Sequence, residues 1–320
     1  MVYAPLTGAR HQAASDKMRG MTSRRAFLRD VTMGLLTTSA APLLGHHASA
    51  QDARPGGPKH PFTGQIGLQL YSLRHLFKKG DVAGTLAMVK SWGLTNLELA
   101  GTYGMSAAEY AALLKKTGLR AVSTHADFNK LSDGLEGVIG DAHTFGVEYL
   151  GCAWIPHGDR FMVADAEKAV KVFNEAGKKA KAANLRFFYH IHGYEFQPGP
   201  DGTLFDTIAA RTDPDLVTFE MDVFWAVRGG AKPVDLFAKY PKRFVLTHLK
   251  DMKKGTAVGD PTGQAPDDSN VPLGEGMIDW PPIVKAANAA GTRYHFIEDE
   301  APAAEQQIPK TLQYLASLKV

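Results

Sequence analysis

The sequence predicts an α/β protein built as a single (β/α)8 barrel, or TIM barrel. Eight short apolar segments alternate with stretches of helical periodicity from Gln65 onward. Gly or Asn follows several of the helical stretches, at positions where helices commonly end. The chain has 320 residues. About 270 of them would remain after an N-terminal leader, which is close to the roughly 250 residues of one barrel.

The eight apolar segments have the length of strands. In chain order they are Ile66–Tyr71, Asn96–Ala100, Ala121–His125, Tyr149–Cys152, Arg186–His190, Val217–Asp222, Phe244–His248 and Tyr294–Glu298. Strands that alternate with helices pair in parallel through right-handed crossovers, so eight such units can close a barrel.

Helical periodicity fills most of the intervals between these segments. The expected helices include Val82–Trp92, Ala107–Lys116, Gly134–Phe145, Ala164–Ala183, Pro233–Lys239, Pro281–Ala290 and Glu305–Leu318. A doubly wound sheet is the competing architecture. Eight units, with no Gly-x-Gly-x-x-Gly loop after the first strand, favour the barrel. The long loop Lys253–Gly276 is either a lid over the barrel mouth or a simple insertion.

Residues 1–50 follow the order of an export signal. Ser23–Arg29 resembles the twin-arginine motif, the apolar stretch Val31–Leu44 comes next, and Ala48–Ala50 offers a cleavage site. The apolar stretch is too short to span a bilayer comfortably, so we expect no stable membrane anchor. The sequence therefore predicts a twin-arginine-type signal peptide at 1–50, a linker at 51–63 and one catalytic domain at 64–320. We expect a periplasmic or secreted protein.

The charge balance bears on the partners of the protein. The whole chain has a net charge of +3, but residues 1–50 hold six basic and two acidic residues. The remainder has 30 basic and 31 acidic residues. Nucleic-acid binding would favour a basic face, so we expect no such partner, and a DNA-repair endonuclease on the same barrel is disfavoured.

The single cysteine, Cys152, is expected to be buried. A homo-oligomer stays open.

Side chains that bind metals gather at the predicted strand ends. A TIM barrel carries its active site at the C-terminal ends of its strands. Side chains two residues apart in a strand lie on the same side of it, so Glu220 and Asp222, for example, point the same way. The set comprises Glu98, His125, His190, His192, Glu220, Asp222, His248 and Glu298, and Lys250 follows His248 on the same side.

Converging carboxylates repel each other unless a positive charge compensates them. One divalent cation would resolve this conflict. Mixed histidine and carboxylate ligands suit Mn, Zn or Co better than Mg, which prefers oxygen ligands alone.

Several segments resemble the sugar phosphate isomerase/epimerase family, whose fold is the xylose-isomerase-like TIM barrel. Tyr189-His190-Ile191-His192-Gly193-Tyr194-Glu195-Phe196 is similar to a Tyr-His-Asn-His-Asp-Phe-Glu-Phe segment of one branch. The resemblance runs over about residues 66–318. Further matching segments are Ile66–Ser72, Glu220–Trp225, His248–Asp251, Gly274–Trp280 and Ile297–Glu298.

The resemblance implies one divalent ion held by the residues that end strands five to eight. Carried over by position, these ligands are His190, Asp222, His248 and Glu298. In ketose epimerases of the family the first ligand is a glutamate, which works with the last to move a proton between the two faces of a carbon. His190 replaces that glutamate here, which counts against two-base epimerisation by this pair.

Such a site suits proton abstraction beside a carbonyl. The ion would chelate a carbonyl and a neighbouring hydroxyl of a sugar and stabilise the enediolate. Glu298 or His192 is the candidate base, and Lys250 is the candidate partner of the oxyanion or of a substrate hydroxyl. The candidate substrate-binding residues are Glu98, His125, Trp154 and Trp225.

Three functions stay open from the sequence. The first is a metal-dependent isomerase or epimerase that acts on a free, glycosidic or keto sugar. The second is a lyase or dehydratase that uses the same enolisation. The third is a non-catalytic periplasmic sugar-binding protein. Export counts against a sugar phosphate as the substrate, because these metabolites are largely cytoplasmic.

Overall fold

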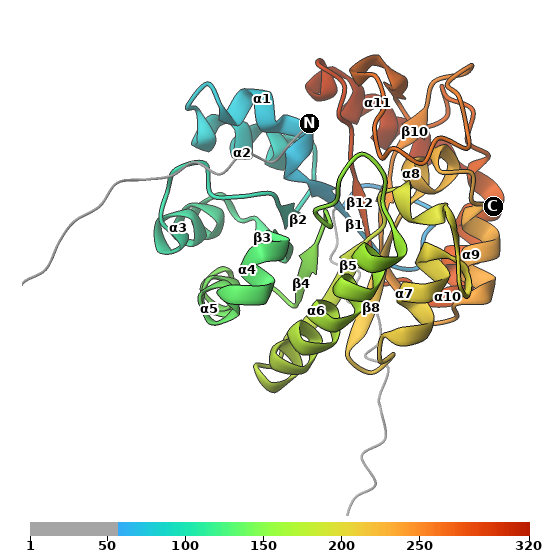
Figure 1. Cartoon of the computed structure of the whole chain (residues 1–320). Coiled ribbons are helices and arrows are strands. Elements are labelled where there is room, and N and C mark those ends of the chain that lie inside the picture. Colours follow the sequence, from blue (N-terminus) through green and yellow to red (C-terminus); the bar gives the residue numbers. More distant parts are fainter. Residues whose placement is uncertain (1–56) are drawn as a thin grey trace, which may run out of the picture. The chain divides into compact units, whose positions relative to one another are not determined.

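The computed structural model describes residues 57–320, which form a closed barrel of eight parallel strands (Figure 1). Neighbours along the chain lie beside each other in the barrel order β1-β12-β9-β8-β5-β4-β3-β2. The predicted (β/α)8 barrel is therefore confirmed. Its strands are β1 (Gln65–Gln69), β2 (Asn96–Leu99), β3 (Arg120–Ala126), β4 (Tyr149–Cys152), β5 (Arg186–His190), β8 (Val217–Asp222), β9 (Phe244–Leu249) and β12 (Tyr294–Ile297).

Helices surround the strands (Figure 1). The seven expected helices correspond to α2 (Val82–Ser91), α3 (Ala107–Thr117), α5 (Leu135–Phe145), α6 (Val163–Ala182), α9 (Pro233–Lys239), α10 (Trp280–Ala290) and α11 (Ala304–Ser317). Gly118, Gly146 and Gly291 end three of them in the left-handed conformation, with φ of 69°, 69° and 75°. These positions are where the sequence predicted helix ends.

Further short elements complete the connections. The helices among them are α1 (Arg74–Phe77), α4 (Phe128–Asp133), α7 (Leu204–Arg211) and α8 (Val223–Arg228), with 3-10 turns η1 (Leu70–Leu73), η2 (Tyr194–Phe196) and η3 (Asp267–Ser269). Two small antiparallel sheets pair β6 (Pro198–Gly199) with β7 (Gly202–Thr203) and β10 (Asp251–Met252) with β11 (Asn270–Val271). Of these helices, α8 positions site residues.

The first strand ends two residues earlier than predicted. The Gln69 side chain accepts a hydrogen bond from the backbone N–H of Tyr71 at 2.9 Å, and the chain turns there into η1. The predicted strand Ile66–Tyr71 is therefore wrong at its C-terminal end. Cys152 is fully buried, as predicted.

Two predictions on the N-terminal part fall on residues that the structure does not describe. The expected signal peptide at 1–50 and most of the linker at 51–63 lie outside residues 57–320. None of the helices formed by residues 57–320 combines the length and the apolar character that crossing a bilayer requires.

Candidate metal centre and active site

The C-terminal ends of the strands bring the predicted side chains together inside the barrel. Asp222 ends β8, His248 lies in β9, and Glu298 directly follows β12. The three side chains offer ligand atoms within 4.8 Å of one another. His190 ends β5, and its Nε2 is 3.9 Å from Asp222 Oδ2. Three of the four predicted metal ligands, Asp222, His248 and Glu298, thus form one group, and His190 approaches it through Asp222.

The Asp222 side chain is held in a defined orientation. Its Oδ1 accepts a hydrogen bond from the Trp225 backbone N–H at 2.8 Å and so caps the N-terminus of α8. Its Oδ2 is buried and has no hydrogen-bond partner among residues 57–320. The local sequence therefore turns one carboxylate oxygen toward the backbone and leaves the other facing the barrel interior.

His248 presents a second buried atom without a hydrogen bond. Its Nδ1 is 3.6 Å from Asp222 Oδ2 and 3.2 Å from Glu298 Oε2, and it forms no hydrogen bond with any described residue. Ligand atoms about 2.1 Å from a tetrahedral ion lie roughly 3.4 Å from one another. Separations of 3.2, 3.6 and 3.9 Å around Asp222 and His248 fit such an ion.

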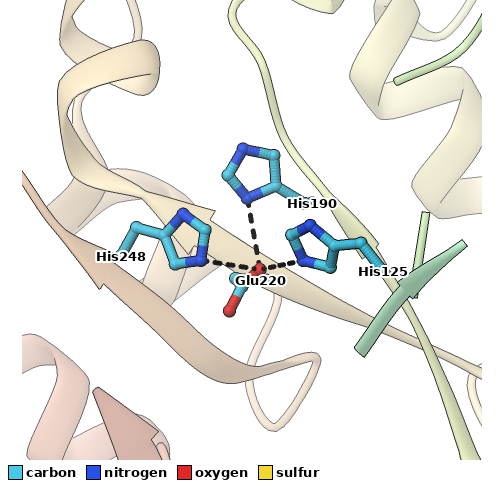
Figure 2. Close-up of side chains that lie close together, drawn as sticks. All are labelled: His125, His190, Glu220 and His248. Atoms are coloured by element: carbon cyan, nitrogen blue, oxygen red, sulfur yellow. Dashed lines mark hydrogen bonds and ion pairs between the residues drawn. The ribbon is translucent and has the colours of Figure 1, made fainter. Parts of the chain in front are cut away.

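A second group of side chains lies on the other side of the same imidazoles (Figure 2). Glu220 Oε2 is 3.2 Å from His190 Nδ1, 3.2 Å from His248 Nε2 and 3.3 Å from His125 Nε2. Glu98 Oε1 is 2.6 Å from His248 Nε2 and 3.1 Å from His125 Nε2. Glu220 was expected on the same side of the strand as Asp222, but no role was predicted for it.

Glu98 and His125 were predicted to bind substrate, and the structure places both in this second group. Glu98 is fully buried and accepts hydrogen bonds from Gln69 Nε2 at 2.7 Å and Ser123 Oγ at 2.6 Å. The His125 side chain keeps an exposed fraction of 11%. Their contact with a substrate stays a prediction.

The second group holds opposite charges close together. Burial raises the pKa of Glu220, but the charge of His248 and hydrogen bonds from His125 and His190 lower it well below its usual value. Burial lowers the pKa of His125, yet the charge of Glu98 and hydrogen bonds from Glu220 and Glu98 raise it, to about 9. At neutral pH a protonated His125 therefore lies between two ionised carboxylates.

Lys250 lies next to Glu298. Its Nζ is 3.3 Å from Glu298 Oε2 and also contacts the Glu300 carboxylate. The ammonium lies 5.2 Å and 5.0 Å from the ring centroids of Phe224 and Trp225. Burial lowers the pKa of Lys250, but the charges of Glu298 and Glu300 raise it above its usual value, so this buried lysine is protonated.

His192 lies between two tryptophans. It stacks on Trp225 with centroids 4.6 Å apart and meets the ring of Trp154 edge-on at 5.1 Å. Burial lowers its pKa well below the usual value, and the charges of His190 and Lys250 lower it further. His192 is therefore a neutral imidazole. The two tryptophans, which were predicted to bind substrate, flank this imidazole, and their contact with a substrate stays a prediction.

The loop Lys253–Gly276 reaches this part of the site. The Arg228 side chain, at the end of α8, donates to the Gln264 carbonyl at 3.3 Å and contacts Ala257 and Asp260. A Cβ at Gly263 would lie 2.8 Å from Tyr194 and 3.3 Å from the His192 ring. The loop thus packs against His192, and its role as a lid or a simple insertion stays open.

Comparison with known proteins agrees with the fold. The family described as xylose isomerase-like TIM barrel matches residues 86–318. A sugar phosphate isomerase/epimerase from Parabacteroides distasonis, solved as a crystal structure, is 26% identical. The similarity covers 84% of this chain and 97% of that one, with a TM-score of 0.65.

Two curated relatives are inosose dehydratases. The enzyme from Lacticaseibacillus casei is 28% identical over 133 residues, which are 39% of this chain and 43% of that protein. Inosose dehydratase 2 from Bacillus cereus is 28% identical over 175 residues, or 53% of this chain and 56% of that protein. The similarity thus spans about half of the length of these relatives.

Proposed function

Because the chain belongs to the xylose isomerase-like TIM-barrel family, we propose that it is a divalent-metal-dependent sugar isomerase or epimerase. It removes a proton from a carbon beside a carbonyl of a free, glycosidic or keto sugar. One observation carries the proposal: Asp222 Oδ2 and His248 Nδ1 are buried without hydrogen bonds and face each other at 3.6 Å. Two buried polar atoms in this state need a partner, and a cation satisfies both.

The four ligands of the ion are His190 Nε2, Asp222 Oδ2, His248 Nδ1 and Glu298. Their mixed nitrogen and oxygen donors suit Mn, Zn or Co better than Mg. When bound, the ion supplies a Lewis acid that acidifies the C–H beside a carbonyl and stabilises the enediolate.

The neighbouring side chains supply the proton chemistry. The pKa of Glu298 is raised by burial, but the charges of Lys250 and His248 lower it well below its usual value, so the carboxylate is ionised and able to accept a proton. His192, a neutral imidazole, is the second candidate base. Lys250 carries a fixed positive charge toward a developing oxyanion or a substrate hydroxyl.

A lyase or dehydratase is the second candidate function, and two observations favour it. His190 occupies the position at which ketose epimerases have a second glutamate. Glu298 is therefore the carboxylate base that remains of that pair. Lys250 Nζ lies 3.3 Å from Glu298 Oε2. Glu298 would take the proton, Lys250 would protonate the departing hydroxyl to water, and the proton would return from Glu298 to Lys250 across this contact.

The predicted export signal bears on the substrate. If the twin-arginine leader at 1–50 directs the chain to the periplasm or outside the cell, the substrate is a sugar present there. A free sugar, a glycoside or an oxidised glycoside meets this condition. We therefore propose a carbohydrate partner of this kind.

The test uses the purified full chain with its metal content measured. It is incubated in deuterated water with free sugars, glycosides and 3-keto glycosides, before and after chelation. We expect about one divalent ion per chain and chelation-sensitive deuterium incorporation beside the carbonyl. A saturated product identifies the isomerase or epimerase, and an unsaturated product identifies the lyase.

Two outcomes would contradict the proposal. Activity on every accepted sugar that survives removal of the ion would exclude the metal-dependent mechanism. Tight sugar binding without metal, without deuterium incorporation and without product would instead identify a sugar-binding protein.

A further inference from the structure

The imidazoles of His190 and His248 each lie between two carboxylates, and one ring nitrogen faces each carboxylate. His190 has Nε2 at 3.9 Å from Asp222 Oδ2 and Nδ1 at 3.2 Å from Glu220 Oε2. His248 has Nδ1 at 3.6 Å from Asp222 Oδ2 and Nε2 at 2.6 Å from Glu98 Oε1. A neutral imidazole carries its proton on one nitrogen, so one side of each ring donates a hydrogen bond and the other offers a lone pair.

The distances show which side donates. The 2.6 Å separation between His248 Nε2 and Glu98 Oε1 is a short, charge-assisted hydrogen bond, and it is well below the roughly 3.4 Å between two ligands of a tetrahedral ion. The contact of His190 Nδ1 with Glu220 Oε2 at 3.2 Å also meets the geometry of a hydrogen bond. The N–H groups therefore point at Glu98 and Glu220.

Hydrogen bonds from neighbouring side chains hold the Glu98 and Glu220 carboxylates. Hydrogen bonds from Gln69 and Ser123 fix both oxygens of Glu98. His125, between the two carboxylates, donates to Glu220 Oε2 at 3.3 Å and lies 3.1 Å from Glu98 Oε1. Figure 2 shows the rings of His125, His190 and His248 converging on Glu220. These contacts give the two acceptors fixed positions.

We propose that Glu98 and Glu220 are positioning residues that set the tautomers of the two histidines. Glu220 holds His190 as the Nδ1–H tautomer, which leaves the Nε2 lone pair for the ion. Glu98, with Glu220, holds His248 as the Nε2–H tautomer, which leaves the Nδ1 lone pair. This inference rests on the proposed function, because it assumes an ion beside Asp222. A hydrogen-bonded carboxylate behind a histidine ligand fixes its ring and raises its basicity.

The proposed tautomers allow an ion on only one side of the two rings. An ion beside His125 and Glu220 would need the lone pairs of His190 Nδ1 and His248 Nε2. In the proposed tautomers these two nitrogens carry protons and offer no lone pair. Two ions on opposite sides of each ring would require both imidazoles to lose their remaining proton. The structure therefore assigns a single ion to the Asp222 side.

The first measurement is the affinity of the purified full chain for Zn²⁺ by calorimetry. We expect one Zn²⁺ per chain, and a 10–100-fold loss of affinity in Glu220→Leu and Glu98→Leu, which remove the acceptors. Glu195→Gln is the matched control. Glu195 is an equally buried glutamate that accepts hydrogen bonds from Tyr189 Oη and from the backbone N–H of His192, both at 2.9 Å. Its substitution should change Zn²⁺ affinity by less than about threefold.

The second measurement reads the tautomers directly and is independent of activity. Nitrogen NMR of ¹⁵N-histidine-labelled, Zn²⁺-loaded protein, assigned with single histidine variants, should show a protonated Nδ1 on His190 and a protonated Nε2 on His248. In Glu220→Gln, whose amide is a weaker, neutral acceptor, the protonated Nδ1 signal of His190 should shift or disappear. The apo-protein melting temperature of each variant reports whether the fold is retained.

The outcomes separate this inference from the proposed function. If the wild-type chain binds no divalent ion, the proposed metal site itself is wrong. If it binds one ion with the opposite tautomers, or if Glu220→Leu and Glu98→Leu keep wild-type affinity, only the positioning role is overturned. If His125→Gln loses affinity as strongly as Asp222→Asn, the ion lies on the Glu220 side and the assignment is also overturned.

Discussion

Asp222 Oδ2 and His248 Nδ1 lie 3.6 Å apart in the barrel interior, and neither forms a hydrogen bond with another described residue. In each of these two side chains the other polar atom already has a partner. Asp222 Oδ1 caps α8 through the Trp225 N–H, and His248 Nε2 contacts Glu98. The two free atoms are thus oriented by the fold before any ion arrives.

The first prediction concerns Asp222→Asn. We expect a loss of Zn²⁺ or Mn²⁺ affinity greater than the 10–100-fold that follows loss of a group behind a ligand. The Asn side-chain oxygen can still cap α8, so the unfolding free energy should change by less than about 1 kcal/mol. Metal analysis and thermal denaturation measure the two effects.

Asp81→Asn is the control for this variant. Asp81 caps α2 by accepting a hydrogen bond from the Gly84 N–H at 2.8 Å, far from the site in the chain. It should keep full metal content. Equal metal content in Asp222→Asn and Asp81→Asn would show that Asp222 is not a ligand.

The second prediction concerns Lys250→Met, which keeps a long unbranched side chain and removes the charge. We expect turnover to fall about 10²–10⁴-fold, because a positioned acid contributes rate enhancements of this size. Metal content should be unchanged, since Lys250 is not a ligand. If the enzyme is a lyase, deuterium exchange beside the carbonyl should persist while elimination stops. Wild-type turnover in this variant would remove Lys250 from the mechanism.

The third prediction is a pH dependence of stability that comes from Glu195. Burial raises its pKa from 4.5 to about 7 in the folded protein. Between these values the folded state binds more protons than the unfolded state, so its stability falls as pH rises. This contribution to the free energy of unfolding is fully present below about pH 4.5 and is lost as the pH rises through 7. It amounts to about 3 kcal/mol.

Glu195→Gln should flatten this profile, because glutamine does not titrate. Urea denaturation of both proteins at several pH values measures the difference in unfolding free energy. We expect the stability of the variant relative to wild type to rise from pH 4.5 to 7. A constant difference between the two proteins across this range would contradict the shifted pKa.

The fourth prediction concerns Arg228→Ala and the loop Lys253–Gly276. Arg228 donates to the Gln264 carbonyl and contacts Ala257 and Asp260, so its removal should loosen the loop. We expect faster trypsin cleavage after Lys253 or Lys254, measured by limited proteolysis and mass spectrometry.

Arg211→Ala is the control, because Arg211 also pairs with two acids, Glu167 and Asp201, but on the exposed surface. Its loop cleavage should match wild type. If Arg228→Ala is cut no faster than Arg211→Ala, the arginine does not hold the loop.

The sequence predicted the barrel and the group of side chains at its mouth because both depend on periodicity. Strand ends recur at fixed positions in a (β/α)8 barrel, so His190, Asp222, His248 and Glu298 could be placed in one region without knowledge of contacts. The expected family was confirmed by the match over residues 86–318. Most of the motifs that carry the resemblance, such as His248–Asp251 and Ile297–Glu298, lie at strand ends.

Other features depend on rotamers and local hydrogen bonds, which periodicity does not specify. The position of Glu220 two residues before Asp222 indicated a common side. Its hydrogen bonds with His125 and His190 required the three-dimensional structure. The helix α8 was likewise missed, because six residues are too few for a helical pattern to stand out. Gln69 ended the first strand early through its own side chain.

The cap of α8 has a consequence for how distant parts of the protein act on each other. Asp222 begins this helix, Arg228 ends it, and Arg228 grips the long loop that touches His192 through Gly263. One short helix thus connects the proposed cation position with this loop. Linkage is reciprocal, so if a bound cation makes the loop more ordered, an ordered loop binds the cation more tightly by the same free energy. If the loop is a lid, substrate entry and metal binding would be thermodynamically coupled.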